Sequence, residues 1–460
     1  MNNGMPTEFI IDKKYEFFTA LDISSTFLGL AVILILAYIK QNRNKDLDYY
    51  RYYMPAILFK VAFVAANCSF YIFVYGAGGD SIGFWDGAVK LNNLFWHDPL
   101  AYFSELWRTD DARTVYEHFN VETGYPDTRI YGERESFFIS KLASVITFVS
   151  FKGYLLMSLI VAFITTNASM RLYELVRSFG LHSDWHIALA VFFVPSLSFW
   201  CGGISKDTIM WISVCYFLHH IYQLISLEKK SSFLNWLGVV VFLYIMWQVR
   251  SFMVVTALAP LLFAYGSRLR KKFGPGSMQS RLASFLILII VSTGIFIFLN
   301  SSFSQDLLKE AEVINKDMTT NKTYGSNRYD LGITDYSTIG MLKAAPASIF
   351  AGVYRPLIWE SLSISLFLNG IESLVLIFFT LRFAFAKGFK ERVATVRDNE
   401  FLIYAFVFAL ILAYFAGFTS ILFGVLVRFK APVLPFLVLI FTAVKRNENE
   451  LSQQIQDGPV

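Results

Sequence analysis

Residues 401–422 read FLIYAFVFALILAYFAGFTSIL, a run without a single charged side chain. A helix that crosses the hydrocarbon core of a bilayer needs about 20 predominantly apolar residues, so this run predicts a transmembrane helix. Similar apolar runs lie near residues 22–39, 54–76, 153–169, 185–201, 207–226, 232–248, 251–267, 282–299, 362–384 and 429–444. The sequence therefore predicts an all-α, polytopic integral membrane protein with about eleven transmembrane helices.

The composition of the 460-residue chain agrees with this fold class. Hydrophobic residues make up 55% of the chain and charged residues 16%, whereas soluble domains carry about 25% charged residues. Too few charges remain to cover a water-soluble surface, which excludes an assembly of soluble domains. The residues before the first apolar run are polar and mixed in charge, so we expect no cleavable signal peptide.

Basic residues gather in alternate loops between the predicted helices. One set of short loops, together with the C-terminal tail, contains half of the 40 Lys and Arg residues: Lys40, Arg43, Lys45, Arg51, Arg171, Arg177, Lys229, Lys230, Arg268, Arg270, Lys271, Lys272, Arg281, Arg382, Lys387, Lys390, Arg392, Arg397, Lys445 and Arg446. Loops rich in Lys and Arg stay in the cytoplasm. The C-terminus is then expected to be cytoplasmic, and an odd number of crossings places the N-terminus outside.

Two long segments, residues 77–152 and 300–361, then lie on the outer side. The first is rich in aromatic and charged residues, which is typical of amphipathic helices that lie in the membrane interface. Residues 137–151 predict a further interfacial helix, because they are too few to cross the bilayer. The second segment begins polar and ends apolar. Neither reads as a soluble domain, so residues 1–460 are expected to form a single membrane domain.

Charged residues at the ends of the predicted helices gather on the same outer side. A charge at this depth is costly unless it reaches the interface, is paired, or is functional. Each one taken alone fits an interfacial residue whose apolar stem lies along the membrane. Taken together they suit a lipid-linked phosphate or pyrophosphate, because Arg offers paired donors and Lys a point charge. The candidate substrate-binding residues are Lys206, Asp207, Arg250, Arg355, Glu360, Arg428 and Lys430.

Asp80 is the candidate catalytic residue. It follows the second predicted helix in GGDSIGFWDGA, residues 78–88. Gly78 and Gly79 allow a tight turn, and Asp80 with Ser81 can cap the helix that follows. A carboxylate at this place can also act as a general base on an incoming hydroxyl. Both roles stay open for Asp80.

Glu372 lies near the middle of the predicted helix 362–384. A carboxylate at this depth is expected to be a hydrogen-bonded or protonated packing residue, with a proton site as the alternative. The cysteines have no paired spacing, which disfavours a disulfide framework or a thiolate metal site. No metal site and no covalently bound cofactor is expected.

Three segments carry a resemblance to a known family. GGDSIGFWDGA resembles the Gly-Asp-Ser/aromatic/Ala pattern that opens the first outer loop of GT-C glycosyltransferases. Residues 193–210, FVPSLSFWCGGISKDTIM, are similar to a Pro-Ser…Phe-Trp…Lys-Asp/Glu segment of those enzymes and of related bacterial polysaccharide polymerases. Residues 427–435, VRFKAPVLP, resemble their late Arg…Pro…Pro helix start. GT-C enzymes are polytopic and use polyprenyl-phosphate-linked sugars.

The resemblance implies roles for individual residues. Asp80 would be the catalytic base or would orient the acceptor, and Lys206 and Arg428 would bind the lipid phosphate. Arg355 lies in none of the three segments. It is added as a phosphate-binding residue only because it is predicted to lie at the same depth in the membrane. GT-C enzymes usually have their key acidic residue after the first helix, whereas Asp80 follows the second predicted helix. One additional helix at the N-terminus would account for this difference. The chain also lacks the large outer domain of oligosaccharyltransferases.

The expected function is transfer of a sugar from a polyprenyl-phosphate-linked donor to an acceptor on the extracytoplasmic face. The expected partners are membrane lipids, the lipid-linked sugar and a glycan, lipid or protein acceptor, with no nucleic acid. The bacterial inner membrane is the expected location. An O-antigen-type polysaccharide polymerase, a transporter or flippase of lipid-linked glycans, and a non-catalytic membrane subunit are the alternatives. The sugar, the acceptor, a divalent-metal requirement and the oligomeric state are left open.

Overall fold

A computed structural model describes most of the chain. The described residues are 15–76, 78–109, 116–225, 232–274, 277–279, 282, 285–286, 289, 312–313, 328–332, 335, 337–361, 363–385 and 387–444. Their regular secondary structure is helical, with no strand in these ranges beyond an isolated bridge between Arg328 and Leu422. The all-α prediction is confirmed.

Seven helical segments in the described ranges are long and apolar enough to cross a membrane. They are α1 (Ala20–Arg43), the run from η2 through α2 (Tyr53–Ser69) to η3 (Asp48–Val74 in all), α7 (Tyr154–Ser178), α10 (Lys206–Ile225), α12 (Phe252–Phe273), α16 (Ile364–Phe385) and α18 (Glu400–Thr419). Each coincides with a predicted apolar run. The expected count of about eleven is not confirmed, because α11 (Phe233–Val249) is shorter and most of the predicted helix 282–299 lies outside the described residues.

Prolines interrupt two of the predicted helices. Residues 185–201 form α8 (Asp184–Phe192) and α9 (Pro195–Trp200), and residues 429–444 fall in α19 (Phe423–Lys430) and α20 (Val433–Thr442). The α19–α20 pair bends by 53° and counts as an eighth crossing only if it is one span. Pro195 and Pro432 stand at the two breaks, where a proline removes a backbone donor and restricts the residue before it. The prediction of two continuous helices was wrong.

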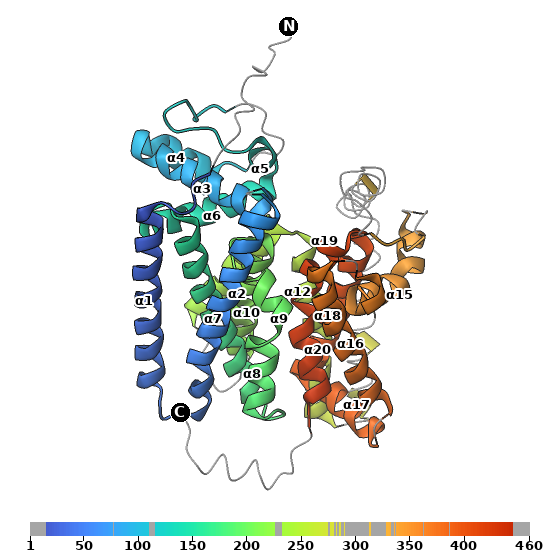
Figure 1. Cartoon of the computed structure of the whole chain (residues 1–460). Coiled ribbons are helices and arrows are strands. Elements are labelled where there is room, and N and C mark those ends of the chain that lie inside the picture. The colour runs from blue at the N-terminus through green and yellow to red at the C-terminus, as the bar shows by residue number, and fades with distance from the viewer. Residues whose placement is uncertain are drawn as a thin grey trace. The chain divides into compact units, whose positions relative to one another are not determined.

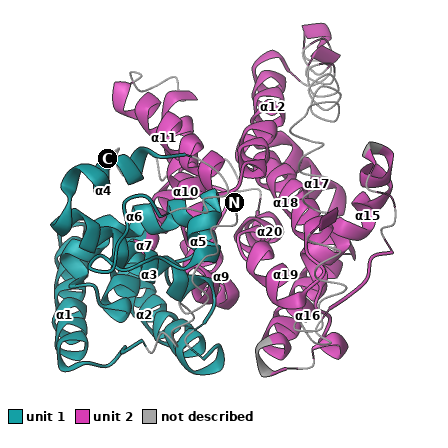
Figure 2. Ribbon diagram, turned by 90° about the horizontal axis from the view of Figure 1, so that it is seen from above, with its two compact units in different colours: residues 1–164, 202–206 teal, residues 165–201, 207–460 magenta. Residues whose placement is uncertain are grey.

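The chain divides into two compact units (Figure 2). Unit 1 comprises residues 1–164 and 202–206, and unit 2 comprises 165–201 and 207–460. In unit 1, four helices gather beyond the end of α1 (Figure 1), and we call them the α3–α6 layer: α3 (Asp80–His97), α4 (Pro99–Trp107), α5 (Thr128–Gly132) and α6 (Arg134–Ser150). The helices predicted for residues 77–152 are therefore present, and their place in the membrane interface stays a prediction.

Small side chains allow the two main helices of the layer to pack closely. A Cβ atom on Gly87 of α3 would lie 2.5 Å from the Ser140 hydroxyl oxygen of α6. Phe84 and Leu91 of α3 and Phe137 of α6 are fully buried beside this contact. The layer therefore has a core of its own, while Trp96 and Trp107 are exposed.

In unit 2, α18 is the central helix, and α12, α20 and α15 (Thr338–Tyr354) pack against it. A Cβ atom on Gly352 of α15 would lie 2.0 Å from the Ala413 carbonyl oxygen, and one on Gly417 equally close to that of Ser348. Small residues permit such approaches between membrane helices. The end of the expected outer segment 300–361 is thus a helix packed into unit 2.

Candidate functional site

A buried carboxylate joins three helices of unit 2. Asp207 lies in the first turn of α10, and its side chain is 1% exposed. Its Oδ1 accepts a hydrogen bond from Arg250 Nη1 at 2.7 Å, and its Oδ2 accepts one from Arg428 Nε at 3.2 Å. Arg250 follows the last residue of α11, and Arg428 lies on α19. The predicted residues Asp207, Arg250 and Arg428 therefore form one ion network.

Aromatic rings also contact the two guanidinium groups. Arg250 lies over the Phe429 ring, 3.9 Å from its centroid, and Arg428 lies 5.7 Å from the centroid of Trp200. A cation over an aromatic face is attracted by the ring quadrupole. Both arginine side chains remain partly exposed, 11% for Arg250 and 17% for Arg428. The arrangement holds two positive groups rigidly while leaving part of each accessible.

Arg355 and Glu360 form a second ion pair in unit 2. Arg355 Nε donates to both carboxylate oxygens of Glu360, at 2.9 and 3.1 Å, and its Nη2 donates as well. Burial of Glu360 favours its neutral form, but the hydrogen bonds from Arg355 and from the Leu357 N–H, with the charge of Arg355, outweigh it. The pKa of Glu360 therefore lies below its usual range. The Arg355 guanidinium also lies over the Tyr329 ring, 4.5 Å from its centroid.

Lys430 connects this pair to the Asp207 network. Its side chain is fully buried, and its Nζ donates to the Arg355 carbonyl at 2.9 Å and to Ser373 Oγ at 2.8 Å. Because Arg428 and Lys430 both belong to α19, the two ion groups share one helix. We call them together the α19 cluster: Asp207, Arg250, Arg355, Glu360, Arg428 and Lys430. It contains four bases and two acids, and the bases still exceed the acids by one when Glu372, which lies near Lys430, is counted as charged. The cluster therefore favours an anion.

Glu372 of α16 lies close enough to Lys430 for the two charges to interact. Its Oε1 accepts a hydrogen bond from the Ser196 backbone N–H at 3.3 Å, and its Oε2 has no hydrogen-bond partner among the described residues. It is a buried residue with one hydrogen bond, and its role as a packing residue or as a proton site stays a prediction.

Lys206 belongs to unit 1 and has acidic partners there. Its Nζ lies 2.8 Å from Glu133 Oε1 and 3.4 Å from Glu135 Oε2. Lys206 and Asp207 are consecutive at the start of α10, yet each contacts a different set of residues. The helix predicted over residues 207–226 begins one residue earlier than expected, at Lys206.

Asp80 is the first residue of α3 and is exposed. The cap position is held by Gly79, whose φ of +84° is accessible to glycine and rarely to other residues. The prediction that Asp80 caps α3 was wrong, since the turn extends one residue less than expected. The negative charge of Asp80 in the first turn still suits the helix dipole. Its catalytic role stays a prediction.

The sequence reasoning missed the aromatic and hydroxyl partners of the α19 cluster. Phe429 stands between the two bases of VRFKAP, and Trp200 precedes the Lys206-Asp207 pair within the same quoted segment. An aromatic residue next to a base in a membrane segment was an available signal. Ser373 and Tyr329 had no such signal, because they are distant in sequence from the bases that they contact.

No three His, Cys, Asp or Glu side chains within the described residues are grouped so that they could hold a metal ion. Comparison of the chain with protein-family models, with curated proteins and with solved structures finds no match. The resemblance to GT-C glycosyltransferases therefore rests on the three quoted segments alone.

Proposed function

We propose that the protein is a membrane glycosyltransferase whose donor is a sugar linked to a polyprenyl phosphate. The observation that supports this proposal best is the buried Asp207 carboxylate, which orients Arg250 and Arg428 while leaving both partly exposed. Guanidinium groups match the geometry of phosphate oxygens. In a chain with several membrane-spanning helices, an anion at such a site is most simply the headgroup of a lipid.

We propose the following chemical step. An acceptor hydroxyl oxygen attacks the anomeric carbon, and the bond between that carbon and the phosphate oxygen breaks. The electron pair of the broken bond goes to the phosphate, whose growing negative charge the arginines stabilise. Asp80 receives the proton of the hydroxyl, and attack from the opposite face inverts the anomeric carbon. The reaction is proposed for the extracytoplasmic face of a bacterial inner membrane.

Binding of the lipid phosphate is the first test. The purified protein in lipid nanodiscs would be titrated with polyprenyl phosphate and the affinity measured by native mass spectrometry. Arg428→Gln should weaken binding at least about tenfold, because it removes one charge-assisted contact worth roughly 1.5–3 kcal/mol. Arg397→Gln is the matched control, since Arg397 is exposed and pairs only with Asp398 among the described residues. Equal affinities of the two variants would contradict the proposal.

Turnover of lipid-linked sugars is the second test. Asp80→Asn should abolish transfer and leave the binding of polyprenyl phosphate unchanged, because Asp80 acts on the acceptor proton. Full turnover by this variant would remove Asp80 from the mechanism. Donors with one sugar and with a preassembled oligosaccharide separate a glycosyltransferase from an O-antigen-type polymerase.

A transporter of lipid-linked glycans is the second candidate, and the interrupted helices favour it. The breaks α8–α9 and α19–α20 both lie in unit 2, and Arg428 and Lys430 end the helix before the second break. Transporters often bind substrate where helices are discontinuous. A reconstituted protein that moves a lipid-linked sugar across a liposome bilayer, without cleaving its glycosyl bond, would favour this function over transfer.

A further inference from the structure

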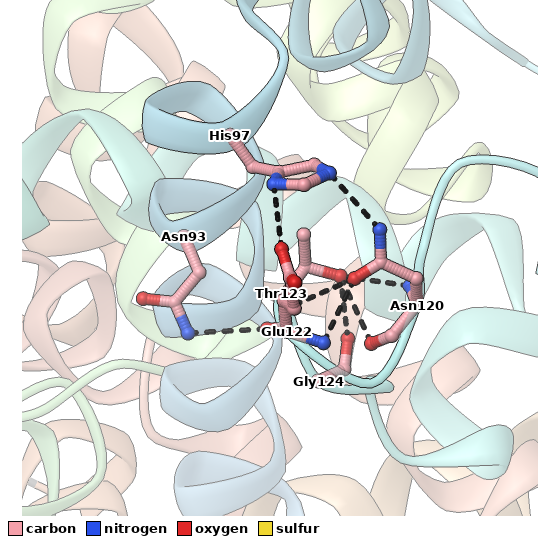
Figure 3. A network of polar contacts seen from close by, with 6 residues as sticks. All are labelled: Asn93, His97, Asn120, Glu122, Thr123 and Gly124. Carbon is pink, nitrogen blue, oxygen red and sulfur yellow. Dashed lines mark hydrogen bonds and ion pairs between the residues drawn. The ribbon is translucent and has the colours of Figure 1, made fainter.

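One polar face of α3, in unit 1, has partners that the proposed function does not use. Asp86, Lys90, Asn93 and His97 follow each other at three- and four-residue spacing, which places them on one side of the helix. This face contacts the loop formed by residues 120–124 (Figure 3). Asn93 Nδ2 donates to the Thr123 carbonyl at 3.1 Å, and His97 Nδ1 lies 3.2 Å from a Glu122 carboxylate oxygen. The loop is thereby fixed against α3.

The loop is also braced internally. Asn120 Oδ1 accepts hydrogen bonds from the backbone N–H groups of Glu122 and Thr123, both at 2.9 Å. Gly124 follows with a φ of +73°, and a Cβ atom on it would lie 3.0 Å from Lys90 Nζ. The absence of a side chain at Gly124 therefore lets the Lys90 ammonium group lie against the loop backbone.

Lys152 reaches the same face of α3 from the end of α6. Phe151 and Lys152 both have left-handed backbones, with φ of 51° and 63°. Non-glycine residues rarely adopt this conformation, and it persists where surrounding contacts enforce it. Two contacts do so here: Trp85 Nε1 donates to the Lys152 carbonyl at 2.7 Å, and Lys152 Nζ donates to Asn93 Oδ1 at 2.7 Å.

The two ammonium groups on this face have different partners. Lys90 Nζ lies 3.6 Å from a carboxylate oxygen of Asp86, whereas Lys152 has no ion pair with any described residue. Partial burial, and then the charge of Lys90, lower the pKa of Lys152 below its usual range. Two ammonium groups that repel each other, one without a carboxylate in contact, are stabilised by an added anion.

We propose that the ammonium groups of Lys90 and Lys152 bind a phosphate group, with Asn93 as the positioning residue for Lys152. Lysine ammonium groups bind phosphate as point charges. Lys152 lies two residues before the membrane-spanning helix α7, so the phosphate has two possible sources, a lipid headgroup or a soluble phosphate. None of these residues belongs to the α19 cluster, so the site is additional to the proposed donor site.

Lysine reactivity tests the proposal on the full chain. The protein in a phosphate-free maltoside detergent would be acylated briefly at pH 8, and the labelled fraction of each lysine measured by peptide mass spectrometry. Pyrophosphate is the soluble probe, and nanodiscs that contain phosphatidic acid are the lipid probe, with nanodiscs of neutral glycolipid for comparison. Lys390, exposed on α17 (Phe389–Asp398), is the internal control because it has no part in the site.

We expect at least a fivefold lower labelling rate of Lys152, with Lys390 unchanged. Protection by pyrophosphate identifies a site for soluble phosphates, and protection by phosphatidic acid alone identifies a headgroup site. Lys90→Gln should lose the protection, and Lys90→Arg should keep it, which also shows that the position tolerates change. If neither probe slows the labelling of Lys152, or if Lys90→Gln is protected as fully as the unmodified chain, the proposal is wrong.

Discussion

At the scale of single residues, Asp207 is the residue of the proposed donor site that contacts both Arg250 and Arg428. The carboxylate is buried and accepts hydrogen bonds from two arginines on different helices. Removing one partner of a buried ion network leaves charges without compensation, which costs about 3–5 kcal/mol. The arginines therefore depend on Asp207 for their position as well as for their stability.

Asp207→Asn should lower the thermal unfolding temperature markedly, because Arg250 and Arg428 would then lie together without a counter-charge. Asp398→Asn is the matched control, since Asp398 is an exposed carboxylate that also pairs with arginine, and exposed pairs contribute about 0–1 kcal/mol. Both variants would be unfolded in the same detergent and followed by intrinsic fluorescence. Similar unfolding temperatures for the two would show that Asp207 has no such role.

Gly79→Ala should destabilise unit 1 by more than about 1 kcal/mol, because alanine avoids a positive φ. The added Cβ would also lie 3.1 Å from the Tyr71 ring. Gly424→Ala is the control, since Gly424 is a helical residue of α19 with open space around it, and alanine there should stabilise by about 0.5–1 kcal/mol. Opposite signs in a denaturation series are the expected result, and equal signs would contradict it.

The Arg355–Glu360 pair predicts an acid-sensitive contribution to stability. Because the pKa of Glu360 is lower in the folded protein than in the unfolded chain, the contribution is fully present above the unfolded pKa. It is lost as the pH falls from about 4.3, the unperturbed value for Glu, through the lower folded pKa. Glu360→Gln should therefore lose stability at pH 7 and show less further loss on acidification. Parallel curves of unfolding temperature against pH would refute this.

At the scale of helices, the sequence predicted where the long apolar segments lie, but it did not predict whether each segment forms one continuous helix. The run 401–422 predicted α18 within a few residues, because no charge or proline interrupts it. Residues 185–201 and 429–444 are equally apolar, yet each is divided at a proline. Pro260 and Pro346 lie inside the continuous helices α12 and α15, so proline alone does not decide between a kink and a break.

The bend between α19 and α20 predicts an effect on binding. Pro432→Ala restores a backbone donor and should let the pair straighten, which would move Arg428 away from Asp207. We expect about a tenfold loss of affinity for polyprenyl phosphate, as for loss of the Arg428 contact itself. Pro55→Ala, in the first turn of α2 where proline is well tolerated, should leave the affinity unchanged. Unchanged affinity in Pro432→Ala would show that the bend does not position the site.

At the scale of the whole molecule, the sequence identified the charged residues and could not assign their partners. Arg250 lies 43 residues from Asp207, and Arg428 lies 221 residues from it. Nothing local links these positions, and the residue next to Asp207, Lys206, pairs instead with Glu133 and Glu135. Burial depth could be inferred from the apolar runs, but pairing depends on which helices pack together.

The expected orientation can be tested on intact cells. The three cysteines are buried, so they would be replaced by alanine and single cysteines introduced at Glu122 and Asp398. A membrane-impermeant maleimide should label Glu122→Cys from outside and Asp398→Cys only after permeabilisation, because Asp398 ends a stretch rich in Lys and Arg. Labelling of both positions from the same side would overturn the orientation.

The order of synthesis gives the three-helix ion network a consequence for assembly. Asp207 and Arg250 leave the ribosome close together, so α10 and α11 can enter the bilayer with their charges already neutralised as a pair. Arg428 is made far later and brings a second positive charge to a carboxylate that is already occupied. The network is therefore completed only when α19 is inserted, and it ties α19 to α10 and to the end of α11.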